Sequence, residues 1–206
     1  MNRFFPILLL AILASSVTHA AVTKTPVDKV RLEKTLKFYR GISVLKVSFK
    51  EVKTLQNLSL KLYSEGNLTV KPPDRVIWEV TKPSPLKVSL EQKAVEIVSG
   101  TGTAKQTQSF SMQDGGGEKG AQALAHLAAW LKLDADALSE QYQIFALEKD
   151  TFEFQPKKQD SSPFKSITMK MGPSGHLQRL QLLEISNDTI RIDFAKPTIE
   201  RANAKK

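Results

Sequence analysis

The chain has 206 residues, with 30 Lys and Arg against 21 Asp and Glu, a formal net charge of +9 and no cysteine. The lack of cysteine excludes disulfides, a thiol nucleophile and lipidation at an N-terminal Cys. The basic balance is compatible with a solvated basic surface or with attraction to anionic lipid, whereas scattered charges without interleaved stacking aromatics argue against nucleic-acid binding.

The first twenty residues are predicted to be a secretory signal peptide. A short basic start at Arg3 precedes an apolar run from Phe4 to Ala14, and small residues end at Ala20. This is the pattern of a cleaved export signal, and the run is too short to span a bilayer. We therefore expect residues 1–20 to be removed and residues 21–206 to form one domain in the bacterial periplasm.

The first half of the remaining chain predicts one helix followed by strands. A helix is expected over 27–39, between Pro26 and Gly41, and a first strand over 45–50. Residues 58–71 alternate strictly between apolar and polar, which predicts a strand with one dry face beginning at Leu58. The turn Pro72-Pro73-Asp74 leads into the next strand, over 75–81.

The later elements follow the same logic. Strands are expected over 86–90, 94–99 and, as a polar edge, 103–112, and then over 142–148, 151–155, 165–171, 177–185 and 189–194. Between these two groups lie a glycine-rich break, a predicted helix over 120–133 and a short helix over 134–140. Short connections require antiparallel pairing. The fold class is therefore mainly β (α+β): an incomplete antiparallel barrel of about ten strands, covered by an N-terminal helix and a helical insertion.

The sequence carries no catalytic or metal-binding motif. Only His126 and His176 remain after processing, and no His-Glu-x-x-His or Gly-x-Ser-x-Gly pattern is present. We predict that the protein is not an enzyme and needs no metal or cofactor.

Apolar side chains instead supply a candidate site. A wide curved sheet covered by few helices favours an apolar cavity, although each residue taken alone fits an ordinary core better than a cavity wall. The predicted cavity residues are Phe49, Leu60, Leu62, Leu68, Val70, Trp78, Val80, Leu127, Trp130, Phe154, Met169, Leu182 and Ile192. The predicted lid or mouth residues are Lys71, Pro72, Arg75, Gly115, Gly116 and Gly117.

One block of the sequence resembles a known family. The block is Gly66-x-Leu68-x-Val70-Lys71-x-Pro73, followed by Trp78 and Pro83, and weaker similarity continues in order to Phe194. It resembles the outer-membrane lipoprotein carrier family, LolA. The resemblance implies an open barrel closed by helices that holds acyl chains and ferries them from an inner-membrane transporter to an outer-membrane acceptor.

The chain departs from the family at Pro72, where members typically carry an Arg that holds the lid. Lys71 and Arg75 flank this position and are candidates to replace that Arg. The resemblance therefore fits a LolA-like member at least as well as the standard lipoprotein carrier.

The sequence predicts a monomeric carrier for an acylated cargo, which is a lipoprotein, a fatty acyl lipid or a glycolipid. The alternative is a structural or interaction protein of the cell envelope with a packed interior. A hydrolase that acts on envelope lipids is the third choice, and the lack of an evident nucleophile–base pair argues against it.

Overall fold

The computed structural model describes residues 24–91, 94–111, 133, 135–159 and 162–201. The described strands form a single antiparallel sheet of 13 strands. The elements are β1 (Thr25–Pro26), α1 (Lys29–Thr35), the 3₁₀ helix η1 (Leu36–Tyr39), β2 (Ile42–Leu55), η2 (Gln56–Leu58), β3 (Leu60–Lys71), β4 (Arg75–Lys82), β5 (Leu86–Glu91), β6 (Ala94–Ser99), η3 (Gly102–Ala104), β7 (Gln106–Ser111), α3 (Ala135–Gln141), β8 (Tyr142–Glu148), β9 (Thr151–Pro156), β10 (Phe164–Met171), β11 (Leu177–Glu184), β12 (Thr189–Phe194) and β13 (Thr198–Arg201).

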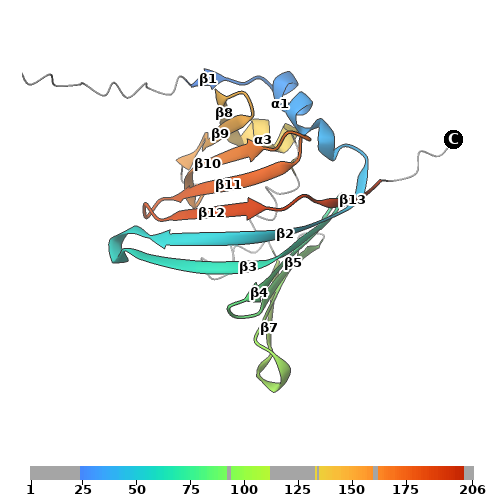
Figure 1. Cartoon of the computed structure of the whole chain (residues 1–206), viewed down its shortest axis with the longest axis vertical. Coiled ribbons are helices and arrows are strands. Elements are labelled where there is room, and N and C mark those ends of the chain that lie inside the picture. Colours follow the sequence, from blue (N-terminus) through green and yellow to red (C-terminus); the bar gives the residue numbers. More distant parts are fainter. Residues whose placement is uncertain (1–23, 92–93, 112–132, 134, 160–161, 202–206) are drawn as a thin grey trace, which may run out of the picture.

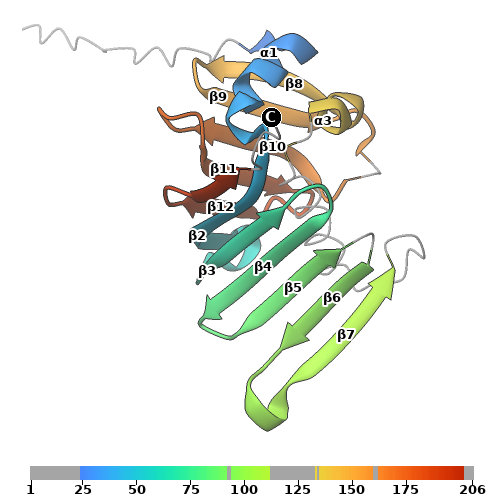
Figure 2. The same ribbon diagram turned by 90° about the vertical axis from the view of Figure 1, so that its right-hand side faces the viewer.

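The sheet is open rather than closed into a barrel. Its strand order is β1-β8-β9-β10-β11-β12-β2-β3-β4-β5-β6-β7, with β13 also paired to β2. Figure 1 shows α1 and α3 near β8–β10, and Figure 2 shows β3–β7 as the opposite part of the curved sheet. The predicted mainly β half-barrel is confirmed. The sheet has more strands than the ten or so expected, because the short strands β1 and β13 carry no local alternation and form only through distant partners.

The N-terminal helix is confirmed with corrected bounds. The helix begins at Lys29 rather than at residue 27, because the carboxylate of Asp28 caps it and accepts the Arg31 backbone N–H at 2.8 Å. It tightens into η1 and stops before Gly41, whose φ of +70° lies in the left-handed region. The predicted helix over 120–133 and the glycine break at Gly115–Gly117 lie almost wholly outside the described residues, whereas α3 matches the short helix expected over 134–140.

The expected dry face of β3 is correct for one half of the strand and wrong for the other. Leu68 and Val70 are buried, but Leu58 is 70% exposed and lies in η2, so the strand begins at Leu60 and not at Leu58. Leu60 and Leu62 are also about half exposed. The reason is the length of the β2–β3 hairpin: β4 pairs with β3 only from Glu65 onward, so the far end of the hairpin has no β4 neighbour.

Gly66 permits the tightest contact of the central sheet. It lies opposite Phe49 on β2, and the Phe49 ring stacks on Trp78 of β4 with ring centroids 4.0 Å apart. A Cβ at Gly66 would lie 1.9 Å from the carbonyl oxygen of Glu79 and 2.9 Å from the Phe49 ring. Only glycine therefore lets the aromatic ring cross β3 and join the core.

Substitution Gly66→Ala should destabilise the fold by about 2 kcal/mol or more, because backbone and ring must both move to admit the methyl group. The measurement is the free energy of unfolding in urea. Gly41→Ala is the matched control: it has nothing within 4 Å of its new Cβ and meets only the left-handed backbone, at a cost of about 1 kcal/mol. Equal losses in the two variants would contradict the proposed close contact.

Candidate functional site

The candidate site is the inner face of the sheet, the face that carries Phe49, Trp78 and Phe154. Alternation places these side chains on the side of the sheet that packs with α1 and α3, since Leu32 and Leu138 belong to the same buried cluster. Arg31 of α1 also lies over the Phe152 ring, 6.0 Å from its centroid. The inner face is therefore the concave, core-facing side.

Most of the predicted cavity residues lie together on this face. Eight of them are at most 8% exposed: Phe49, Leu68, Val70, Trp78, Phe154, Met169, Leu182 and Ile192. Val80 is half-buried and packs against the same cluster. Leu60 and Leu62 share the inner face by register, yet they are 46% and 47% exposed and stand apart from the packed core. Leu127 and Trp130 lie outside the described residues.

A small apolar pocket lies at one end of the inner face. Its volume is about 50 Å³. It is lined by Tyr39, Ile42, Leu45, Val47, Leu68, Val70, Pro72, Leu133, Leu177, Phe194 and Pro197. Pockets that enclose drug-sized ligands measure about 300 Å³ or more, so this pocket is too small for an acyl chain as it stands.

Tyr39 fastens η1 to the pocket wall. Its hydroxyl oxygen accepts the backbone N–H of Leu177 at 2.6 Å. Burial raises the pKa of Tyr39 to about 12, against the opposing effect of that hydrogen bond, so the phenol stays protonated at neutral pH. Arg201 of β13 holds the same segment, because its guanidinium donates to the carbonyl oxygens of Phe38 and Arg40. One side of the pocket is thus a helical turn held by these polar contacts and by the buried side chain of Leu36.

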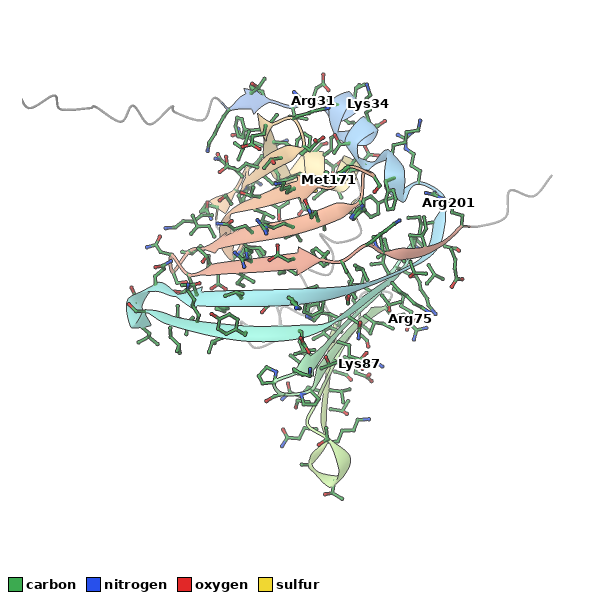
Figure 3. All side chains as sticks on the ribbon, in the orientation of Figure 1. Arg31, Lys34, Arg75, Lys87, Met171 and Arg201 are labelled. Carbon is green, nitrogen blue, oxygen red and sulfur yellow. The ribbon has the colours of Figure 1, made fainter. Side chains whose placement is uncertain are left out.

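The predicted mouth residues lie in the β3–β4 turn beside this pocket. Pro72 lines the pocket, and Lys71 and Arg75 face each other across the turn. Arg75 lies at the start of β4 and its guanidinium is 3.6 Å from the Glu91 carboxylate of β5 (Figure 3). Lys71 makes no ion pair within the described part of the chain. Gly115, Gly116 and Gly117 are outside it.

Three charged side chains interrupt the apolar inner face at its other end. Glu51 and Lys53 follow Phe49 at alternate positions of β2, and Glu184 ends β11. The Lys53 ammonium lies 2.8 and 3.0 Å from the two carboxylate oxygens of Glu184. Burial raises the pKa of Glu51, while a hydrogen bond to the Ser64 side chain and the Lys53 charge oppose that shift.

This charged group is absent from the residues predicted for the site, although the sequence of β2 carries a signal for it. The strand predicted over 45–50 stops where its apolar residues end. Continuing its alternation beyond Phe49 places Glu51 and Lys53 on the same face as Leu45, Val47 and Phe49. Charged residues at dry-face positions were the overlooked sign. Glu184 was not predictable in this way, because only the pairing of β2, β12 and β11 brings it near Lys53.

The fold and the site together define a class: an open antiparallel half-barrel with a long apolar inner face. Residues 40–206 match the family described as outer membrane lipoprotein carrier protein LolA, so the chain belongs to the LolA family. The family resemblance seen in the Gly66–Pro83 block is thereby confirmed. The family takes its description from proteins that carry outer-membrane lipoproteins. No curated protein matches the sequence.

Solved structures similar to this chain have low sequence identity to it. A LolA superfamily protein from Nitrosomonas europaea has 10% identity and a TM-score of 0.44, with 85% of this chain and 95% of that chain covered. The lipoprotein LppX from Mycobacterium tuberculosis has 9% identity and a TM-score of 0.41, with 86% and 98% covered. The MucA/MucB complex of Pseudomonas aeruginosa has 14% identity and a TM-score of 0.46, with 87% and 59% covered.

No group of three His, Cys, Asp or Glu side chains in the described ranges is arranged to hold a metal ion. In the same ranges, no helix combines the length and the apolar character needed to cross a membrane.

The raised pKa of Glu51 predicts a pH-dependent cost to stability. Because the folded protein binds the Glu51 proton more readily than the unfolded chain does, this cost is absent below the ordinary glutamate pKa and full above the raised one. Glu51→Gln removes the titration. Its free energy of unfolding relative to the wild type should therefore be more favourable near pH 7 than near pH 4, as measured by urea unfolding.

Glu96→Gln, at an exposed position on β6, is the matched control for the loss of one negative charge. A Glu51→Gln effect that is the same at both pH values would show that the carboxylate is not held in a desolvated site.

Proposed function

We propose that the protein is a periplasmic carrier that binds the acyl chains of a lipoprotein or another lipid and passes the cargo between the inner and outer membranes. The observation that carries this proposal is the apolar inner face of an unclosed sheet in a member of the LolA family. Each methylene buried there contributes about 0.8 kcal/mol, so a carrier in water needs a large apolar face. Export with removal of residues 1–20 belongs to the same proposal.

Cargo binding requires the interior to widen. In this proposal the pocket of about 50 Å³ belongs to a closed form, and the residues that line it suggest where the interior would open. Tyr39 on η1 and Pro72 in the β3–β4 turn lie on its wall, and both come from short segments rather than from the centre of a strand. We infer that η1 moves away from the sheet when the acyl chain enters, since an acyl chain that fits only the open form shifts the population toward it.

The partners in this scheme are an inner-membrane transporter or exporter and an outer-membrane acceptor. The cargo class includes lipoproteins, fatty acyl lipids and glycolipids. Pro72 separates this chain from the standard lipoprotein carriers, and the contact between Arg75 and Glu91 directs that Arg toward β5. We therefore propose that Lys71, rather than Arg75, takes the place of the lid-holding Arg of the family.

One observation favours a second candidate function. The described interior is closely packed around a small pocket, which also suits a structural or interaction protein of the cell envelope. Lipid extraction and mass spectrometry of protein purified from its own periplasm separate the two. A stoichiometric acylated molecule supports the carrier, and a lipid-free protein supports the packed alternative.

Delipidated protein should take up a fluorescent fatty acid, and Val70→Phe should weaken that uptake by about tenfold or more. Val70 lines the pocket, and the larger ring fills the space into which the acyl chain would enter. Fluorescence titration measures the affinity, and circular dichroism checks the fold.

Ile77→Phe is the matched control, because Ile77 lies on β4 with its side chain on the opposite face of the sheet. Its uptake should equal that of the wild type. Unchanged uptake in Val70→Phe would place the acyl chain elsewhere, and a wild-type protein that takes up no fatty acid would exclude the carrier function.

A further inference from the structure

The inner face changes from apolar to charged along β2. Glu51 lies between Ser64 of β3 and Ile192 of β12, and Lys53 lies between Leu62 and Ile190 of the same two strands. Rows nearer the pocket carry apolar side chains at the corresponding positions, such as Leu45 opposite Val70. Charges are seldom placed on a core-facing sheet surface without a specific partner, because desolvation of a charge is costly.

The charged group carries an excess of negative charge. Lys53 is engaged by Glu184, whose side chain is 17% exposed. No cation of the described residues lies within ion-pair distance of Glu51, although its carboxylate accepts a hydrogen bond from Ser64 and feels the Lys53 charge. The group therefore has two carboxylates and one ammonium. The carboxylate of Glu51 is the one without an ammonium partner among the described residues.

Uncovered apolar surface adjoins these charges. Leu60 and Leu62 lie on the same face as Glu51 and Lys53, and each remains about half exposed. Leu62 is directly opposite Lys53, so apolar and charged surface meet within one cross-strand pair. A surface of this kind complements an amphiphile whose apolar chain and polar group are close together.

We propose that Glu51, beside the Lys53–Glu184 pair, binds a protonated amine on the polar part of the acylated cargo, while the part of the acyl chain next to that amine lies over Leu60 and Leu62. The inference rests on the proposed carrier function and adds the charge of the cargo. An ammonium would supply the counter-charge that Glu51 lacks. A phosphate or sulfate group would instead meet two carboxylates across a surface of low polarity, which strengthens the repulsion.

The test compares two amphiphiles with the same chain, dodecylamine and dodecyl sulfate, each below its micelle concentration. Isothermal titration calorimetry on the delipidated protein measures the affinity for each amphiphile. About 0.15 M salt is used because it screens non-specific attraction to the basic surface. The wild type should bind the amine about tenfold more tightly than the sulfate. Glu51→Gln should remove most of this preference.

Lys53→Met should change the preference for the amine in the opposite direction. It removes the ammonium and leaves Glu184 without its partner, so the preference for the amine should increase. If the three charged residues had only a structural role, both variants would bind both amphiphiles more weakly and the preference would stay unchanged. Glu96→Gln, which removes an exposed negative charge from β6, is the control and should preserve the wild-type preference.

The outcomes separate the two proposals. Binding of neither amphiphile overturns the carrier function and this inference with it. Binding of both with equal affinity, tighter binding of the sulfate, or a preference unchanged by Glu51→Gln overturns this inference alone and leaves the carrier function standing.

Discussion

Strand β2 joins the two halves of the described sheet, and its pleat determines which side chains reach the interior. It hydrogen-bonds to β3 on one side and to β12 and β13 on the other. Alternate residues from Leu45 to Leu55 therefore share one face over almost the whole width of the concave surface. The same alternation that buries Leu45, Val47 and Phe49 also carries Glu51 and Lys53 inward. The apolar pocket and the charged group thus lie near opposite ends of β2.

A carrier fold must be stable without cargo and still admit it. The stack of Phe49 on Trp78 over Gly66 meets the first requirement by closing the middle of the inner face. The second depends on the margins, where η1 is held through the hydroxyl of Tyr39 and the guanidinium of Arg201. A net hydrogen bond contributes about 1 kcal/mol, far less than a buried aromatic pair. Each of these marginal hydrogen bonds therefore adds less to the stability of the packed interior than the central aromatic stack does.

The sequence predicts those parts of the molecule that depend on local pattern. Strands β6, β8 and β12 have the expected bounds, because apolar alternation and flanking turns are visible in the chain itself. Residues whose surroundings come from distant strands were predicted less well. Leu60 and Leu62 alternate as core residues do, but their exposure follows from the shortness of β4, which the pattern of β3 does not contain. Glu184 likewise meets Lys53 only through pairing across β12.

The position of β2 in the chain also has a consequence for how the protein is made. Strands β2 and β3 are adjacent in the sequence and can pair as a hairpin early, whereas the other edge of β2 pairs only with β12 and β13, near the end of the chain. For example, the Gln56 backbone N–H donates a hydrogen bond to the Asp188 carboxylate, 132 residues further on. Long-range pairing of this kind is slow, and an unpaired edge with exposed leucines at its tip invites association with other chains. Until β12 and β13 are in place, this edge of β2 is therefore open to pairing with other chains.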